Sequence, residues 1–177
     1  MTPTAVSQAL RQLVVEEKQP VFIWGSPGTG KSGVVHQLAT ELGIALRDIR
    51  ALLLDPVDLR GLPFVGKDGR SQWATPDFLP QDGEGILFLD ELNAAPAMVQ
   101  ASCYQLVLDR KLGEYTLPEG WAIVAAGNRD SDRAATTRMT SYAPWKDRAY
   151  GDVESPQPRT CYDLSALKEK HTRDADG

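Results

Sequence analysis

The chain has 177 residues, of which 42% are hydrophobic and 24% are charged, as in a single globular domain with a buried core. Its formal net charge of -5 argues against the overall basic surface of a nucleic-acid-binding protein. No apolar run approaches the ~20 residues that a membrane span needs, and the N-terminus lacks a signal-peptide pattern. The 2 cysteines and 2 histidines are too few for a disulfide framework or a zinc site. We therefore expect a protein of the reducing cytoplasm that contacts no membrane and binds no nucleic acid.

Three helices are predicted by apolar residues at helical spacing. The first ends before Pro20, and its apolar face consists of Val6, Leu10, Leu13 and Val14. The second covers residues 33–43, with Gly43 as its C-terminal stop. The third is opened by Asn93 and Pro96, and its apolar residues are Met98, Cys103, Leu106 and Leu108.

Short apolar runs between these helices predict four strands. The runs are VFIW at 21–24, a segment within 45–54, ILFLD at 86–90 and AIVAAGN at 122–128. Strands that alternate with helices in this way favour a parallel α/β sheet.

Two inserts interrupt the alternation. The segment GLPFVGKDGRSQWA places Asp68 and Gly69 between apolar flanks, which predicts a β-hairpin. The segment LGEYTLPEGWAIV places Pro118 and Gly120 at positions that fit a type I turn over residues 117–120.

The segment GSPGTGKS, which follows the first strand directly, has the spacing of a phosphate-binding loop. Glycines allow successive backbone N–H groups to point inward at the N-terminus of the next helix. Lys31 can reach the β- and γ-phosphates of a nucleotide, and the Ser32 hydroxyl can ligate Mg²⁺. The predicted nucleotide-binding residues are Gly25, Ser26, Pro27, Gly28, Thr29, Gly30, Lys31 and Ser32.

Two carboxylates end the third predicted strand, in ILFLDEL. Because ligands bind at the carboxyl edge of open α/β sheets, Asp90 is placed to hold the magnesium shell. Glu91 is placed to accept a proton from an attacking water, or to orient that water. The alternative is that both residues cap the next helix, a role that Asn93 could also take. A small-molecule kinase has no need of the second carboxylate, because its acceptor hydroxyl replaces water.

Asn128 ends the fourth predicted strand, in AAGNRD. An amide at this place lies beside the strand of the phosphate loop and could position water against the γ-phosphate. The alternative is an asparagine that serves only the strand-end turn. Beside the other motifs, the functional interpretation is favoured.

The motifs GSPGTGKS, LFLDEL and AAGNRDSDR, in this order, resemble the Walker A, Walker B and sensor-one motifs of AAA+ ATPases. The two inserts resemble the helix-two insert and the hairpin before sensor one, which together are typical of the MoxR-type branch. The resemblance covers roughly residues 1–141. It implies a three-layer αβα P-loop NTPase core that binds ATP with Mg²⁺ through Ser32 and Asp90. It also implies Glu91 as catalytic base, Asn128 as sensor of the water, and Lys31 as a catalytic cation.

The same resemblance implies partners. MoxR-type members act as chaperone-like ATPases in hexameric rings, often with a von Willebrand factor A domain protein, on a protein client. After Ser141 the sequence departs from the family pattern, which continues with an arginine finger, a fifth strand and a helical lid. We therefore expect an incomplete core over 1–141 and a divergent or disordered tail over 142–177, without the fifth strand or the lid. Arg148 does not match the context of the finger.

Three functions remain open at this stage. The first is a MoxR-type ATPase module that keeps its own motifs but lacks the elements supplied between subunits, so that turnover is weak. The second is a nucleotide-binding fragment without useful catalysis. The third is a small P-loop kinase.

Overall fold

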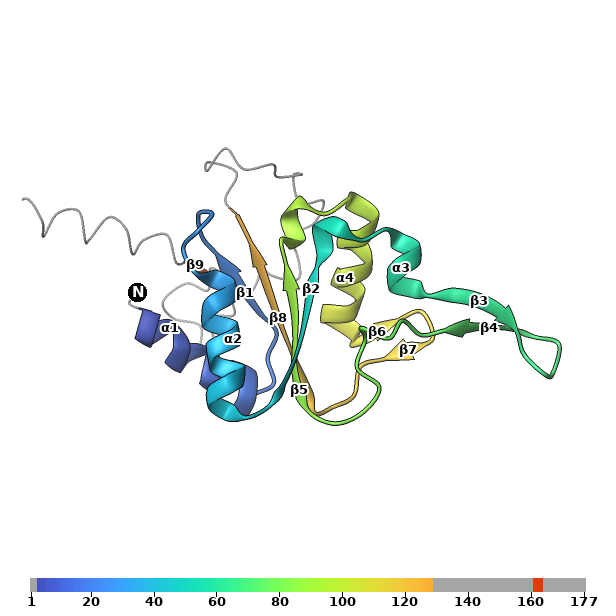
Figure 1. Ribbon diagram of the computed structural model, residues 1–177, viewed down its shortest axis with the longest axis horizontal. Helices are drawn as coiled ribbons and strands as arrows, with labels where there is room; N and C mark the ends of the chain where they lie inside the picture. The colour runs from blue at the N-terminus through green and yellow to red at the C-terminus, as the bar shows by residue number, and fades with distance from the viewer. Residues whose placement is uncertain (1–2, 129–160, 164–177) are drawn as a thin grey trace, which may run out of the picture.

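The computed structural model describes residues 3–128 and 161–163, and a parallel five-stranded sheet forms its centre. The strand order is β2-β5-β8-β1-β9 (Figure 1). The strands are β1 (Val21–Trp24), β2 (Ala45–Arg50), β5 (Gly85–Asp90), β8 (Trp121–Gly127) and β9 (Cys161–Asp163). The four strands expected from the apolar runs are therefore confirmed.

Helices cover both faces of the sheet, so the expected three-layer α/β fold is confirmed. On one face lie α1 (Pro3–Leu10), a π-helical turn (Arg11–Glu16) and α2 (Lys31–Leu42); on the other lies α4 (Ala97–Asp109). Side chains of β5 alternate between the layers, with Phe88 in the α1–α2 core and Leu87 in the α4 core. A strand buried on both faces reads as a continuous apolar run, which is why ILFLD shows no alternation.

The first helical face is confirmed, because Val6, Leu10, Leu13 and Val14 are all buried. The second helix begins at Lys31, two residues before the predicted start, and ends as predicted at Gly43. Gly43 adopts a φ of 66° and its N–H donates to the carbonyls of Ala39 and Thr40.

The third predicted helix is confirmed, but its four apolar residues do not all face the core. Cys103 and Leu106 are buried, whereas Met98 is 66% and Leu108 57% exposed. Each exposed residue is five positions from Cys103, about 140° around a helix of 3.6 residues per turn. Asn93 does not open α4 either: it lies in the 3-10 turn Leu92–Ala94, and Pro96 directly precedes the helix.

Two antiparallel hairpins extend from this core. The first joins β3 (Leu62–Val65) to β4 (Ser71–Ala74) and reaches away from the sheet in Figure 1. Its loop closes where the Gly66 N–H donates to the Arg70 carbonyl at 2.8 Å, and Gly69 has a φ of 76°. The short helix α3 (Pro56–Arg60) precedes it. This hairpin is confirmed.

The second hairpin joins β6 (Lys111–Leu112) to β7 (Tyr115–Thr116). Its chain reversal lies at Gly113, whose φ is 59°. The turn predicted over residues 117–120 is displaced by one residue, because the Trp121 N–H donates to the Pro118 carbonyl at 3.0 Å. That turn leads into β8 and does not close the hairpin.

The expected absence of a fifth strand is wrong. Strand β9 pairs in parallel with β1, with Phe22 opposite Cys161 and Trp24 opposite Asp163. The side of β1 that faces away from β8 carries backbone N–H and C=O groups that need partners, and a short extended segment can supply them. Three residues are too few to show a periodicity in sequence. The lid, Arg148 and the rest of the predicted tail lie outside the described residues. In residues 3–128 and 161–163, no helix is long and apolar enough to cross a bilayer.

At Gly85, strand β5 lies unusually close to its neighbours β2 and β8. Adding a single methyl group there is therefore expected to destabilise the fold. A Cβ there would lie 2.3 Å from the Ala45 carbonyl oxygen and 2.9 Å from the Trp121 ring. Gly85→Ala should lower the free energy of unfolding by about 1–3 kcal/mol, as measured by urea denaturation. The control is Gly33→Ala in α2, where a Cβ meets nothing within 4 Å, and it should stabilise by about 0.5–1 kcal/mol. Equal midpoints for Gly85→Ala and the parent would contradict the close approach.

Candidate functional site

The loop of residues 25–30 leaves the end of β1 and enters α2 at Lys31. Gly28 and Gly30 have φ values of 75° and 84°, in the left-handed region that side chains rarely adopt. The Gly25 N–H donates to the Gly127 carbonyl at 3.3 Å, which ties the start of the loop to the end of β8. The loop leads directly into the N-terminus of α2, and backbone N–H groups at a helix N-terminus suit a phosphate group.

The Lys31 ammonium lies between the loop and the end of β8. Its Nζ donates to the Gly25 carbonyl at 2.8 Å, the Ser26 carbonyl at 3.1 Å and Asn128 Oδ1 at 2.9 Å. The residue is 8% exposed, so these oxygens replace most of the water that its charge would otherwise keep. The structure therefore brings Lys31 and Asn128 together, as expected for two residues that act on the same phosphate.

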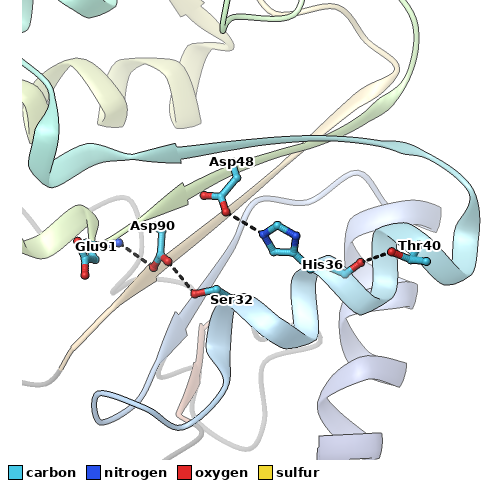
Figure 2. A network of polar contacts seen from close by, with 6 residues as sticks. All are labelled: Ser32, His36, Thr40, Asp48, Asp90 and Glu91. Atoms are coloured by element: carbon cyan, nitrogen blue, oxygen red, sulfur yellow. Dashed lines mark hydrogen bonds and ion pairs between the residues drawn. The ribbon is translucent and has the colours of Figure 1, made fainter.

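Ser32 and Asp90 form a second contact at the same edge of the sheet. Ser32 Oγ donates to Asp90 Oδ2 at 2.7 Å, and Asp90 Oδ1 accepts the Glu91 backbone N–H at 2.9 Å (Figure 2). A hydroxyl beside a carboxylate supplies hard oxygen donors of the kind that Mg²⁺ binds. The residues present therefore fit the expected metal ion.

Glu91 has a backbone conformation that is unusual for its residue type. Its φ is 55°, in the left-handed region, and it follows β5 directly before the 3-10 turn. A non-glycine residue held there costs of the order of 1–3 kcal/mol, which is typical of functional sites. Among the described residues, no hydrogen bond or ion pair to the Glu91 carboxylate is present, and it caps neither the 3-10 turn nor α4. The Glu91 side chain therefore does not serve as a helix cap.

Asn93 belongs to the site although its sequence suggested only a capping role. It is fully buried; its Nδ2 donates to the Asn128 carbonyl at 2.5 Å, and its Oδ1 accepts the Asn128 N–H at 3.0 Å. The signal that could have identified it is a polar residue placed among Leu92, Ala94 and Ala95. A side chain in such an apolar segment is buried with its neighbours and needs a partner.

Other reactive side chains lie away from this site or are inert. His36 pairs with Asp48 at 2.8 Å, one helical turn from Ser32, and joins α2 to β2 (Figure 2). In the part of the chain that the structure describes, no three His, Cys, Asp or Glu residues form a metal-binding group. Burial raises the pKa of the Cys103 thiol to about 12, so that it stays protonated at neutral pH.

The fold is similar to those of several solved structures. RuvB from Thermotoga maritima (P216G mutant) has a TM-score of 0.58 at 18% identity, over 99% of this chain and 52% of that one. NtrX from Brucella abortus in complex with ADP has a TM-score of 0.57 at 16% identity, over 93% and 36%. A Cytophaga hutchinsonii protein, provisionally assigned as an ATPase, has a TM-score of 0.58 at 17% identity, over 98% and 50%.

The chain thus spans about half the length of these proteins or less. At such identities the likeness concerns the fold alone. The sequence itself gives the family. The model of the family described as "ATPase family associated with various cellular activities (AAA)" matches residues 21–141, well over half of the chain, and the protein therefore belongs to the AAA family of ATPases.

Proposed function

We propose that this protein binds ATP with Mg²⁺ and hydrolyses it at the carboxyl edge of β1, β5 and β8. The observation that carries the proposal is the position of the Lys31 ammonium, which contacts both the phosphate loop and Asn128. The contact of Ser32 with Asp90 lies beside it, on the next residue of α2. Phosphate-binding, metal-binding and water-positioning groups therefore come from four chain segments and meet at one edge.

In the binding step, the loop N–H groups and the N-terminus of α2 receive the β- and γ-phosphates. Lys31 exchanges carbonyl oxygens of its own loop for phosphate oxygens, at little cost because both are acceptors. Ser32 and Asp90 would hold Mg²⁺, which supplies charge neutralisation on the phosphates when bound.

In the chemical step, water attacks the γ-phosphorus while the bond from that phosphorus to the β,γ-bridging oxygen breaks. Glu91 accepts the proton of the water, and the products are ADP and inorganic phosphate. The Asn128 side chain orients the water against the γ-phosphate. The left-handed backbone of Glu91, with a φ of 55°, supports its role, because residues held in such conformations cluster at functional sites.

We also propose that the chain is of the MoxR type, and that it acts on a protein client with a von Willebrand factor A domain partner. Support comes from the positions of the two hairpins, one between α3 and β5 and the other between α4 and β8. They flank a groove lined by Arg60, Trp73 and Tyr115. Exposed apolar side chains on the first hairpin, Phe64 and Val65 among them, suit contact with another protein.

Turnover by the isolated chain is proposed to be weak. Residues 142–177 do not carry the arginine finger or lid pattern that the family resemblance would require, and the family match ends at residue 141. A finger from a neighbouring subunit contributes about 10³–10⁵ to turnover in related phosphoryl-transfer systems.

Lys31→Ala should remove most of the affinity for Mg-ATP, because it deletes the cation that faces the terminal phosphates. Isothermal titration calorimetry measures the affinity, and circular dichroism checks that the fold is kept. Lys67→Ala is the matched control, since Lys67 lies in the exposed loop of the first hairpin. Equal affinity of Lys31→Ala and the parent would show that the loop does not bind the phosphates.

Glu91→Gln should separate binding from hydrolysis. Glutamine keeps the shape and removes the base, so Mg-ATP should still bind while hydrolysis falls by about 10²–10⁴. Single-turnover release of phosphate measures the effect, and Glu84→Gln on the exposed loop before β5 is the control. A rate equal to that of the parent would exclude Glu91 as the base.

Turnover per chain should remain low and flat as protein concentration rises, because no subunit supplies a finger to its neighbour. Phosphate release is followed over a wide range of protein concentration, with native mass spectrometry at each end of the range. Brisk turnover that increases with concentration would contradict this proposal, and would show that subunits complete one another's sites.

A further inference from the structure

The side-chain amide of Asn93 forms two hydrogen bonds to the backbone of a single residue, Asn128. Its Nδ2 donates to the Asn128 carbonyl at 2.5 Å, and its Oδ1 accepts the Asn128 N–H at 3.0 Å. The side chain is 0% exposed. These two bonds close a ring between the segment after β5 and the end of β8. Because both partners are backbone groups of Asn128, the ring fixes the position of the Asn128 backbone and thus of the Cα atom that carries its side chain.

The end of β8 is packed directly against this amide. A Cβ on Gly127 would lie 2.5 Å from Asn93 Oδ1 and 2.9 Å from the Phe22 ring. Gly127 also accepts the Gly25 N–H at 3.3 Å. The phosphate loop, the segment after Glu91 and the end of β8 are therefore joined within two residues of Asn128.

We infer that Asn93 is a positioning residue for ATP hydrolysis. It holds the backbone of Asn128 at a fixed place relative to Glu91, so that Asn128 Oδ1 meets Lys31 and the amide faces the γ-phosphate. The inference rests on the proposed function, since it concerns the same site. Asn93 itself touches no substrate, because it is fully buried and both of its polar ends are used.

Only an amide satisfies both bonds at this position. The Asn128 N–H needs an acceptor and the Asn128 carbonyl needs a donor. Aspartate would set a carboxylate oxygen against that carbonyl, and an apolar residue would leave two partly buried backbone groups without these partners. Loss of the ring would let Asn128 move, and a displacement of about 1 Å at a catalytic group can cost about 10²-fold in rate.

The experiment compares Asn93→Ala, Asn93→Asp and the control Gln100→Met in the full chain. Gln100 is also a fully buried amide in this region, but it bonds to the Ala95 carbonyl and to the Tyr104 hydroxyl. Its loss should lower thermal stability without affecting Asn128. Three quantities are measured for each variant: the Kd of Mg-ATP, the single-turnover rate of hydrolysis, and the hydrogen-exchange rate of the Asn128 amide.

For both Asn93 variants we expect a Kd within about threefold of the parent's and a hydrolysis rate about 10²-fold lower. Exchange of the Asn128 amide should be slow in the parent and in Gln100→Met, and clearly faster in Asn93→Ala. Asn93→Asp keeps the acceptor for that N–H, so its amide should stay protected while its hydrolysis still falls.

The inference is overturned if the Asn93 variants hydrolyse bound ATP as fast as Gln100→Met does. It is also overturned if the Asn128 amide exchanges equally in the parent and in Asn93→Ala, a result that needs no hydrolysis to obtain. A parent that neither binds nor hydrolyses ATP would instead overturn the proposed function. If Asn93→Ala does not fold, Asn93→Asp, which preserves volume, decides the question through its rate.

Discussion

Parallel hydrogen bonding of β1 and β5 to the two sides of β8 is the constraint on which the site depends. Trp24 lies opposite Gly127 in one ladder, and Leu89 lies opposite Ala125 in the other. The three parallel strands end at the same edge of the sheet. There β1 leads into the phosphate loop, β5 ends at Asp90, and β8 is followed by Asn128. A shift of one register position would turn every side chain of a strand to the other face of the sheet. The burial of both faces prevents such a shift.

Burial of the Lys31 ammonium is the main energetic cost of bringing these strand ends together. A charged ammonium at 8% exposure is unfavourable unless oxygen acceptors surround it. Two loop carbonyls and the Asn128 side chain meet that need. The same acceptors fix the direction of the lysine side chain and hold the loop around the ammonium.

The sequence allowed the central strands and the site residues to be located, because both depend on short-range patterns. Lys31, Ser32 and Asp90 follow from motif spacing, and the buried strands follow from apolar runs. Two other features depend on tertiary contacts. Asn93 could be recognised only once its distance to Asn128 was known. Strand β9 forms because it can pair with the side of β1 that faces away from β8, and its three residues show no strand pattern in the sequence.

Two differences between the sequence-based expectations and the structure have local causes: the position of the turn near residues 117–120 and the burial of the apolar residues in α4. Proline and glycine marked a turn near residues 117–120, but they could not distinguish two registers one residue apart. Met98 was counted among the apolar residues of the third helix, and the helix turns it outward. Apolar identity alone does not fix a face; the spacing to Cys103 does.

The outer strand of the sheet has a consequence for how this protein behaves at high concentration. Strand β2 lies at one edge, and its residues include the exposed Arg47, Asp48 and Arg50. An unprotected edge offers its backbone to strands of other chains, which is the common route to amyloid-like association. Here an incoming strand would have to approach through charges of both signs and strip their water. These charged residues of β2, which take no part in the proposed catalysis, therefore oppose edge-to-edge association of the sheet with other chains.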